Sequence, residues 1–129
     1  MRFMIIVRAS PAADDGEPAD GGALVEMMKF HASLMAAGVV RWVEALELGS
    51  RGVRVQYAAG RRTVISGPLP PPRELIVGFW IIEVSSREQA LEWADRVPLV
   101  DGQVELREAV FQILPVTYDD QFLSWRREK

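Results

Sequence analysis

The segment 64–84 constrains the fold of this chain more than any other part of the sequence. A strand that ends at Ser66 meets a Gly67–Pro68 corner, and a linker with three consecutive prolines leads into a second strand at 76–84. This second strand is apolar on both faces, so both faces need to be covered from water. Helices on one side of a sheet and a partner on the other side provide that cover.

Hydrophobic periodicity and breaker residues predict the remaining elements. The predicted strands are 3–8, 40–48, 53–57, a short strand up to 66, 76–84 and 104–114, and the predicted helices are 23–38 and the segment from Ser85 to Pro98. The order is β-α-β with an inserted β-hairpin, followed by β-α-β. With both helices on one face of an antiparallel sheet, this order predicts a ferredoxin-like α+β sandwich of the βαββαβ type.

Local signals mark the ends of several elements. Gly38 stands where a helix C-cap is expected, and Ser85 with Glu88 predicts a capping box for the second helix. In the last strand the apolar positions change parity, which predicts a bulge near Arg107–Glu108. The buried stripe of the second helix is predicted to be Ala90, Leu91, Ala94 and Val97.

The helix-free face of the predicted sheet is too apolar to stay in water, because monomers rarely expose large apolar patches. We therefore expect a homodimer that packs these faces together. Residues 9–22 are small, acidic and rich in breakers, which predicts a lid or rim loop.

A C-terminal extension, 115–129, follows the predicted domain at 1–114. Its pattern predicts a short helix capped by Thr117, with acidic residues first and basic residues last, the order that the helix dipole favours. The side chains of Tyr118, Phe122 and Trp125 fall on one face of this helix. We expect that face to dock on the body of the protein or on the partner subunit.

Composition excludes several classes of function. A net charge of −3 with scattered basic residues argues against a nucleic-acid-binding surface. The absence of cysteine excludes disulfides, thiolate metal sites and cysteine nucleophiles. The sequence has one histidine and no glycine-rich phosphate loop. We therefore expect neither a metal site nor a bound cofactor. No apolar run is long enough for a membrane span or a signal peptide, so we expect a cytoplasmic protein.

Two polar residues interrupt otherwise apolar faces. His31 lies within the stripe of the first helix, and Glu44 lies in the alternating strand 40–48. If both meet in one cleft between helix and sheet, they form a candidate general acid/base pair, because each shifts the pKa of the other. The alternatives are a hydrogen-bonded core histidine, and a Glu44 that faces the dimer partner or pairs with Arg8 or Arg41.

Four further residues are candidates for the same cleft. Ser66, at a strand end, is a third catalytic candidate or a turn residue that bonds nearby backbone. Arg8 holds an anionic substrate or neutralises Glu44. Glu74 and Trp80 complete the substrate-binding candidates, with Glu74 alternatively capping the proline linker and Trp80 alternatively lying in the dimer core.

These residues stand among short motifs whose order and spacing resemble the YCII-related family, in its DGPF-type branch. The motifs are Phe3 to Val7, Ala37-Gly38-Val39-Val40, Glu44-Ala45-Leu46, Gly52-Val53-Arg54-Val55, Ser66-Gly67-Pro68-Leu69, Glu74, Gly78-Phe79-Trp80 and Ala90-Leu91-Glu92-Trp93-Ala94. The resemblance implies a dimeric ferredoxin-like fold, similar to the dimeric α+β barrels, with a histidine and an aspartate in an active-site cleft. In this chain Ser66 stands where the family signature has that aspartate, and Leu69 stands where it has a phenylalanine.

Three hypotheses follow for function. The first is a small cytosolic homodimer that binds a small organic molecule in the helix–sheet cleft and carries out acid/base chemistry without a cofactor. The second is a non-catalytic dimeric binding or regulatory module with a degenerate active site. The third, by fold analogy alone, is a cofactor-free oxygenase-like member of the dimeric α+β barrels.

Overall fold

The described residues form a four-stranded antiparallel sheet with two helices and a separate β-hairpin. The computed structural model describes residues 1–9, 21–47, 51–67 and 76–110. In these residues the elements are β1 (Arg2–Ala9), α2 (Gly21–Ala36), β2 (Val40–Ala45), β3 (Val53–Ala58), β4 (Arg61–Ser66), β5 (Ile76–Glu83), α3 (Arg87–Asp95) and β6 (Gly102–Glu108). The strand order is β2-β5-β1-β6 with every neighbour antiparallel, and β3 pairs with β4 alone. This order confirms the predicted ferredoxin-like α+β fold.

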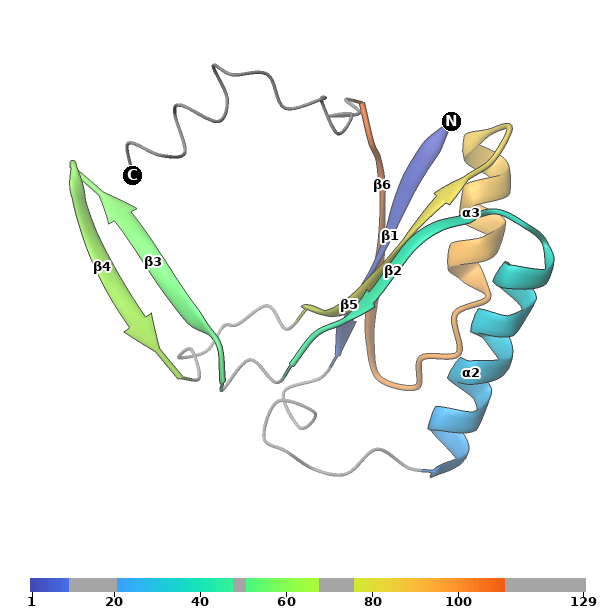
Figure 1. The fold of residues 1–129 in the computed structure, drawn as a ribbon, viewed down its shortest axis with the longest axis horizontal. Coiled ribbons are helices and arrows are strands. Elements are labelled where there is room, and N and C mark those ends of the chain that lie inside the picture. Colours follow the sequence, from blue (N-terminus) through green and yellow to red (C-terminus); the bar gives the residue numbers. More distant parts are fainter. Residues whose placement is uncertain (10–20, 48–50, 68–75, 111–129) are drawn as a thin grey trace, which may run out of the picture.

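Both helices cover the same face of the sheet (Figure 1). Alternate residues of β1 point toward them, because successive side chains of a strand project to opposite faces. Phe3, Ile5 and Val7 are almost fully buried on this face. They form one core with residues from α2, β5 and α3, namely Phe30, Leu34, Trp80, Ile82, Val84 and Ala90.

The opposite face of the sheet carries no helix among the described residues and is also largely apolar. The register aligns Ile6 with Phe79, Met4 with Ile81, and Trp42 with Ile81 on the other side. Ile6 is buried between its neighbours, whereas Trp42 is 59% exposed. A face of this composition fits contact with another surface better than contact with water.

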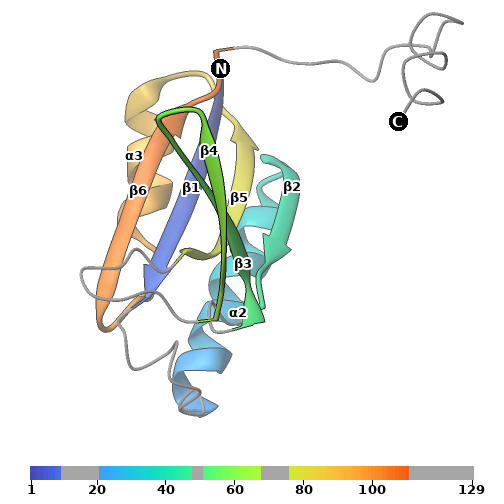
Figure 2. The same ribbon diagram turned by 90° about the vertical axis from the view of Figure 1, so that its left-hand side faces the viewer.

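The hairpin of β3 and β4 stands on the helix-free side of the sheet (Figure 1), and Figure 2 shows it in front of the sheet strands. Its two-residue turn has Ala59 at φ 51° and Gly60 at φ 77°, the positive values that a type I′ hairpin turn requires. One face of the hairpin is apolar, with Val55 opposite Val64 and Tyr57 beside them. All three side chains are exposed.

Several predicted boundaries need correction. The N-cap of α3 is Ser86, whose hydroxyl accepts a hydrogen bond from the Gln89 amide. The Gln89 side chain in turn accepts a bond from the amide of Ser85, the residue before the N-cap. The N-cap therefore lies one residue later than predicted. The predicted bulge near Arg107–Glu108 is wrong, because the β1–β6 register is continuous to the end of β6.

Other local predictions agree with the structure. Gly38 has φ 71° and closes α2 through a bond from its amide to the Met35 carbonyl. Ala90 and Ala94 are buried as expected, although Leu91 is 58% exposed. The predicted loop 9–22 and extension 115–129 lie largely or wholly outside the described residues. No helix in the described part of the chain is long and apolar enough to cross a membrane.

Candidate functional site

His31 projects from α2 toward the sheet and is held there by Trp80 of β5. The indole Nε1 of Trp80 donates a hydrogen bond to His31 Nδ1 over 3.1 Å. The two rings are roughly parallel, 28° apart at a centroid distance of 6.5 Å. Trp80 is itself 6% exposed and packs edge-to-face against Phe30 at 5.3 Å. The helix–sheet core therefore sets the orientation of the imidazole.

This hydrogen bond also selects the tautomer of His31. An indole nitrogen only donates, so Nδ1 of His31 must accept. The proton of the neutral imidazole then lies on Nε2, the nitrogen that Trp80 does not contact. The His31 side chain is half-buried. In this tautomer the half-buried imidazole presents one N–H donor, at Nε2, in a defined position.

Glu44 lies on the other side of the sheet from His31. The β2–β5 register aligns Val43 with Trp80 and Glu44 with Phe79. Since Trp80 faces the helices, Glu44 shares the helix-free face with Phe79. The prediction that His31 and Glu44 meet in one cleft is therefore wrong. The register shift between Val40 and Trp42 moves the rest of β2 onto the opposite parity.

Arg8 is also on the helix-free face, and it pairs with Glu105 of β6. The distance from Arg8 Nη2 to Glu105 Oε1 is 2.6 Å, with side chains 23% and 34% exposed. Sequence reasoning offered Glu44 as the partner of Arg8 and missed Glu105. Arg41, the other predicted partner of Glu44, instead pairs with Glu83 at 2.8 Å. Arg8 and Arg41 therefore form ion pairs with Glu105 and Glu83, and the predicted pairing of either arginine with Glu44 is not formed.

The remaining candidates do not join His31, apart from Trp80. Ser66 is exposed at the end of β4, opposite Val53 in the hairpin. The hairpin of β3 and β4 lies on the side of the sheet away from α2 (Figure 1). Glu74 lies outside the described residues. Trp80 belongs to the core under the helices, so its alternative placement in the dimer core is wrong.

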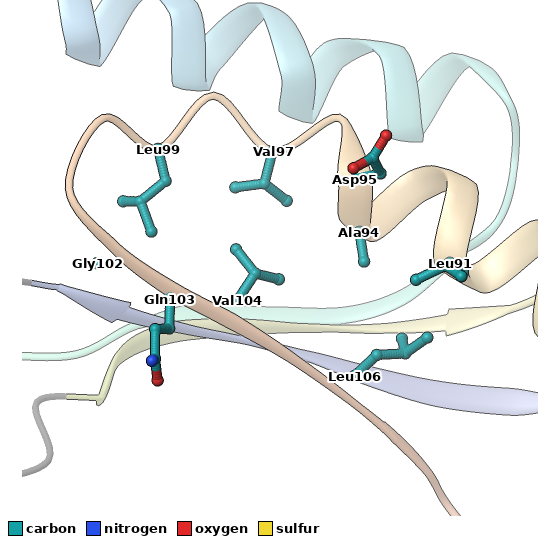
Figure 3. A pocket seen from close by; sticks show the side chains of 9 residues that line it. All are labelled: Leu91, Ala94, Asp95, Val97, Leu99, Gly102, Gln103, Val104 and Leu106. Carbon is teal, nitrogen blue, oxygen red and sulfur yellow. The ribbon is translucent and has the colours of Figure 1, made fainter.

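A separate groove lies between α3 and β6 and has a volume of about 410 Å³. Figure 3 shows Val97 and Leu99 pointing toward β6 and Val104 pointing back toward them. The remaining wall residues are Leu91, Ala94, Asp95, Gly102, Gln103 and Leu106. Sequence reasoning missed this groove, although the prediction of Leu91 and Val97 in one apolar stripe was its signal. No group of three or more His, Asp or Glu side chains in the described segments is placed to hold a metal ion.

The strand order and one-sided helix layer define the class: an α+β sandwich of the ferredoxin-like kind. Within it, the chain belongs to the YCII-related domain family, whose model matches residues 1–113, which confirms the family resemblance. The DGPF-type branch stays a prediction.

One solved structure with this fold is 5-chloro-2-hydroxyhydroquinone dehydrochlorinase (TftG) from Burkholderia phenoliruptrix AC1100, in complex with 2,5-dihydroxybenzoquinone. The TM-score is 0.50 at 12% sequence identity, over 87% of this chain and 96% of that one. At this identity the likeness concerns the fold alone. A comparison with curated proteins finds none that matches.

Proposed function

We propose that this protein is a homodimer that binds a small organic molecule beside α2, and that the neutral imidazole of His31 acts on that molecule as a general acid through its Nε2–H, without a cofactor. The observation that carries the proposal is the hydrogen bond from Trp80 to His31 Nδ1. This bond occupies Nδ1, so Nε2 is the nitrogen that can contact the ligand, and it fixes the direction in which the Nε2–H bond points. Trp80 acts in this proposal as the positioning residue of His31.

The class of ligand follows from which groups can accept a proton from an imidazole N–H. Hydroxylated aromatic and quinone-type rings carry carbonyl and ionised hydroxyl oxygens that accept one, and the neighbour of the same fold binds 2,5-dihydroxybenzoquinone. A small planar hydroxyquinone is therefore the first ligand to test. The roles of Arg8, Glu44 and Ser66 in the same reaction are left out, because these residues lie on the other side of the sheet or in the hairpin.

The homodimer is supported by two surfaces that the described residues leave uncovered. The helix-free face of the sheet exposes Trp42 beside Phe79 and Ile81. The hairpin exposes the apolar side chains of both of its strands, and an isolated two-stranded hairpin is only marginally stable in water. A second copy related by a two-fold axis would cover both surfaces in each subunit. We place this dimer in the cytoplasm.

A non-catalytic binding module is the second candidate. The observation in its favour is the separation of Glu44 from His31, because it removes the carboxylate that would tune the imidazole. Such a module would bind the same class of ligand but would move no proton on binding.

Titration of 2,5-dihydroxybenzoquinone by calorimetry tests the proposal. We expect binding to the wild-type protein, accompanied by proton uptake or release that is measured by repeating the titration in buffers of different ionisation enthalpy. His31→Gln should weaken binding about tenfold, the effect of losing roughly 1.4 kcal/mol of interaction. Met35→Gln, at an exposed position of the same helix, is the matched control and should bind normally.

The outcomes separate the two candidates. Binding that involves His31 but transfers no proton would support the binding module. Equal affinity of His31→Gln and wild type would show that the ligand does not use His31 and would remove the proposed site. Because His31 is the only histidine, its imidazole signals in NMR spectra report on the ligand without ambiguity.

A further inference from the structure

β6 is an outer strand of the sheet, with β1 on one side and no described strand on the other (Figure 2). Natural sheets protect such an edge with lysine, proline, a bulge or a very short strand, because an open edge pairs with other chains. Residues 102–108 contain neither lysine nor proline. The strand is seven residues long, and its register with β1 is continuous. The edge of β6 is therefore suited to strand pairing.

The hydrogen bonds from β6 to β1 show which backbone groups of β6 point outward. The Ala109 amide donates to the Arg2 carbonyl, which continues the β1–β6 register by one step. In an antiparallel pair, residues that exchange such bonds alternate with residues whose N–H and C=O groups point away from the neighbouring strand. Val104, Leu106 and Glu108 are therefore the residues of β6 that present these groups at the open edge.

The sequence around Leu106 is complementary to itself in antiparallel orientation. A two-fold axis at Leu106 places Leu106 opposite Leu106 of a second copy and Val104 opposite Glu108, so outward backbone groups meet outward backbone groups. The same register places Glu105 opposite Arg107 on both sides of the axis. Side chains lie closest at such non-hydrogen-bonded positions, and opposite charges directly across two strands stabilise the pairing. An axis at Val104 would instead place Glu105 opposite an uncharged residue.

The charged side chains are placed to reach a second copy. Arg107 is 70% exposed, and its Nε lies 3.6 Å from Oε2 of Glu105 in the same strand. The other carboxylate oxygen of Glu105, Oε1, accepts a hydrogen bond from Arg8. A neighbouring strand in the proposed register would bring a second arginine beside Glu105, at the oxygen that Arg8 does not contact.

Two leucines would add apolar contact at the axis. Leu91 and Leu106 lie at the same end of the groove between α3 and β6 (Figure 3). Leu91 is 58% exposed and Leu106 is partly buried. Because Leu106 is paired with Ile5 of the core face, its side chain lies on the helix side of the sheet. With the axis at Leu106, the leucines of both copies gather there and leave water together.

From these observations we infer that β6 pairs with β6 of a second copy, antiparallel about a two-fold axis at Leu106, and joins two four-stranded sheets into one continuous sheet. This contact uses the edge of the sheet, whereas the homodimer proposed above uses its helix-free face. The inference therefore does not rest on the proposed function.

Single-cysteine variants test the inference, because the chain has no cysteine and any disulfide must join two copies. In the proposed register the Leu106→Cys positions face each other at a Cα separation of about 5.5 Å, which a disulfide spans. Val104→Cys is the matched control on the same strand and face, with its two thiols about 13 Å apart along the strands. We expect Leu106→Cys to form a product of twice the chain mass roughly ten times faster, since only this pair is within disulfide reach.

A second pair of variants tests the register without changing a core side chain. Glu105→Cys mixed with Arg107→Cys should give mainly the mixed disulfide, identified by mass spectrometry. Two cysteines at the same one of these positions would be offset by about 7 Å along the strands. Equal rates for Leu106→Cys and Val104→Cys, or no excess of the mixed disulfide, would overturn the inference. A faster Val104→Cys would refute the axis at Leu106.

The charge pairs have their own test in the Leu106→Cys background. Arg107→Glu should slow cross-linking several-fold at low salt, because it places two carboxylates opposite each other on both sides of the axis. Arg54→Glu makes the same charge change at an exposed position of the hairpin and should have little effect. Equal slowing by both would contradict the proposed charge pairs.

Trp42→Glu in the same background distinguishes this contact from the proposed homodimer. It places a charge on the helix-free face and should leave the Leu106→Cys cross-link unchanged, whether or not the face-to-face dimer forms. Loss of the cross-link in this variant would mean that the edge pairing is not a contact of its own and would contradict the inference.

Discussion

Replacement of Trp80 by phenylalanine isolates the hydrogen bond that orients His31. The change keeps an aromatic ring against Phe30 and removes the indole N–H that donates to His31 Nδ1. The lost hydrogen bond should cost about 1 kcal/mol of unfolding free energy. Trp80 is 6% exposed, so the space left by the smaller ring should add roughly 1–2 kcal/mol.

A double-mutant cycle separates these two contributions. His31→Ala alone leaves the buried Trp80 donor without its acceptor, which costs about 1–3 kcal/mol. In the Trp80→Phe background the same change removes no hydrogen bond and should cost less. The coupling energy between the two positions should therefore be about 1 kcal/mol. Urea unfolding followed by far-UV circular dichroism measures it, at one fixed protein concentration because association stabilises folded subunits.

The tautomer of His31 provides a second readout of the same bond. In ¹⁵N-labelled protein the neutral imidazole should carry its proton on Nε2, with Nδ1 unprotonated. Trp80→Phe should allow both tautomers. A coupling energy below about 0.3 kcal/mol, or a wild-type spectrum with the proton on Nδ1, would refute the assignment of Trp80 as the positioning residue.

Three further variants test the packing and the proposed dimer. Trp42→Glu places a charge on the exposed helix-free face and should weaken association at least tenfold in sedimentation experiments; unchanged association would contradict a dimer through this face. Leu34→Ala, at a fully buried position, should lower the unfolding free energy by about 2–5 kcal/mol in urea titrations, and a loss below 1 kcal/mol would mean that α2 packs more loosely than described. Gly102→Ala should weaken the protection of the β1–β6 pairing in hydrogen exchange, because the added Cβ would clash with the Arg8 carbonyl oxygen and because Gly102 has φ 134°; normal protection of β6 would show that the turn has another conformation.

Periodicity predicted the fold because the core depends on it directly. Residues 3–7 are apolar at every position, and a strand that is apolar on both faces needs a covering layer on both sides. Phe3, Ile5 and Val7 form the half of it that the helices cover. Exact ends were less accessible to prediction. Ser85 and Ser86 are adjacent and either hydroxyl can cap a helix, and the choice of Ser86 depends on how the chain leaves β5.

The candidate site could be predicted only in part. The alternation of side chains along a strand indicates which residues share a face, but it does not indicate whether that face points toward the helices. Val40 and Trp42 have the same parity, yet Val40 aligns with Ile82 of the core and Trp42 aligns with Ile81 of the other face. The register shift between them took Glu44 away from His31. No sequence signal indicates that shift. The hydrogen bond between Trp80 and His31 joins residues that are 49 positions apart in the sequence. Such a contact depends on how the helix packs on the sheet, so the local sequence pattern does not predict it.

The strand order also affects how this protein is made. β1 lies in the middle of the sheet, yet both of its neighbours are synthesised late, and the ion pair between Arg8 and Glu105 spans 97 positions. At ribosomal speeds of 5–20 residues per second, β1 waits roughly 5–20 s for its last neighbour. During that interval the apolar side chains of β1 are exposed and can be bound by chaperones. Strand pairing over such long sequence separations also slows refolding.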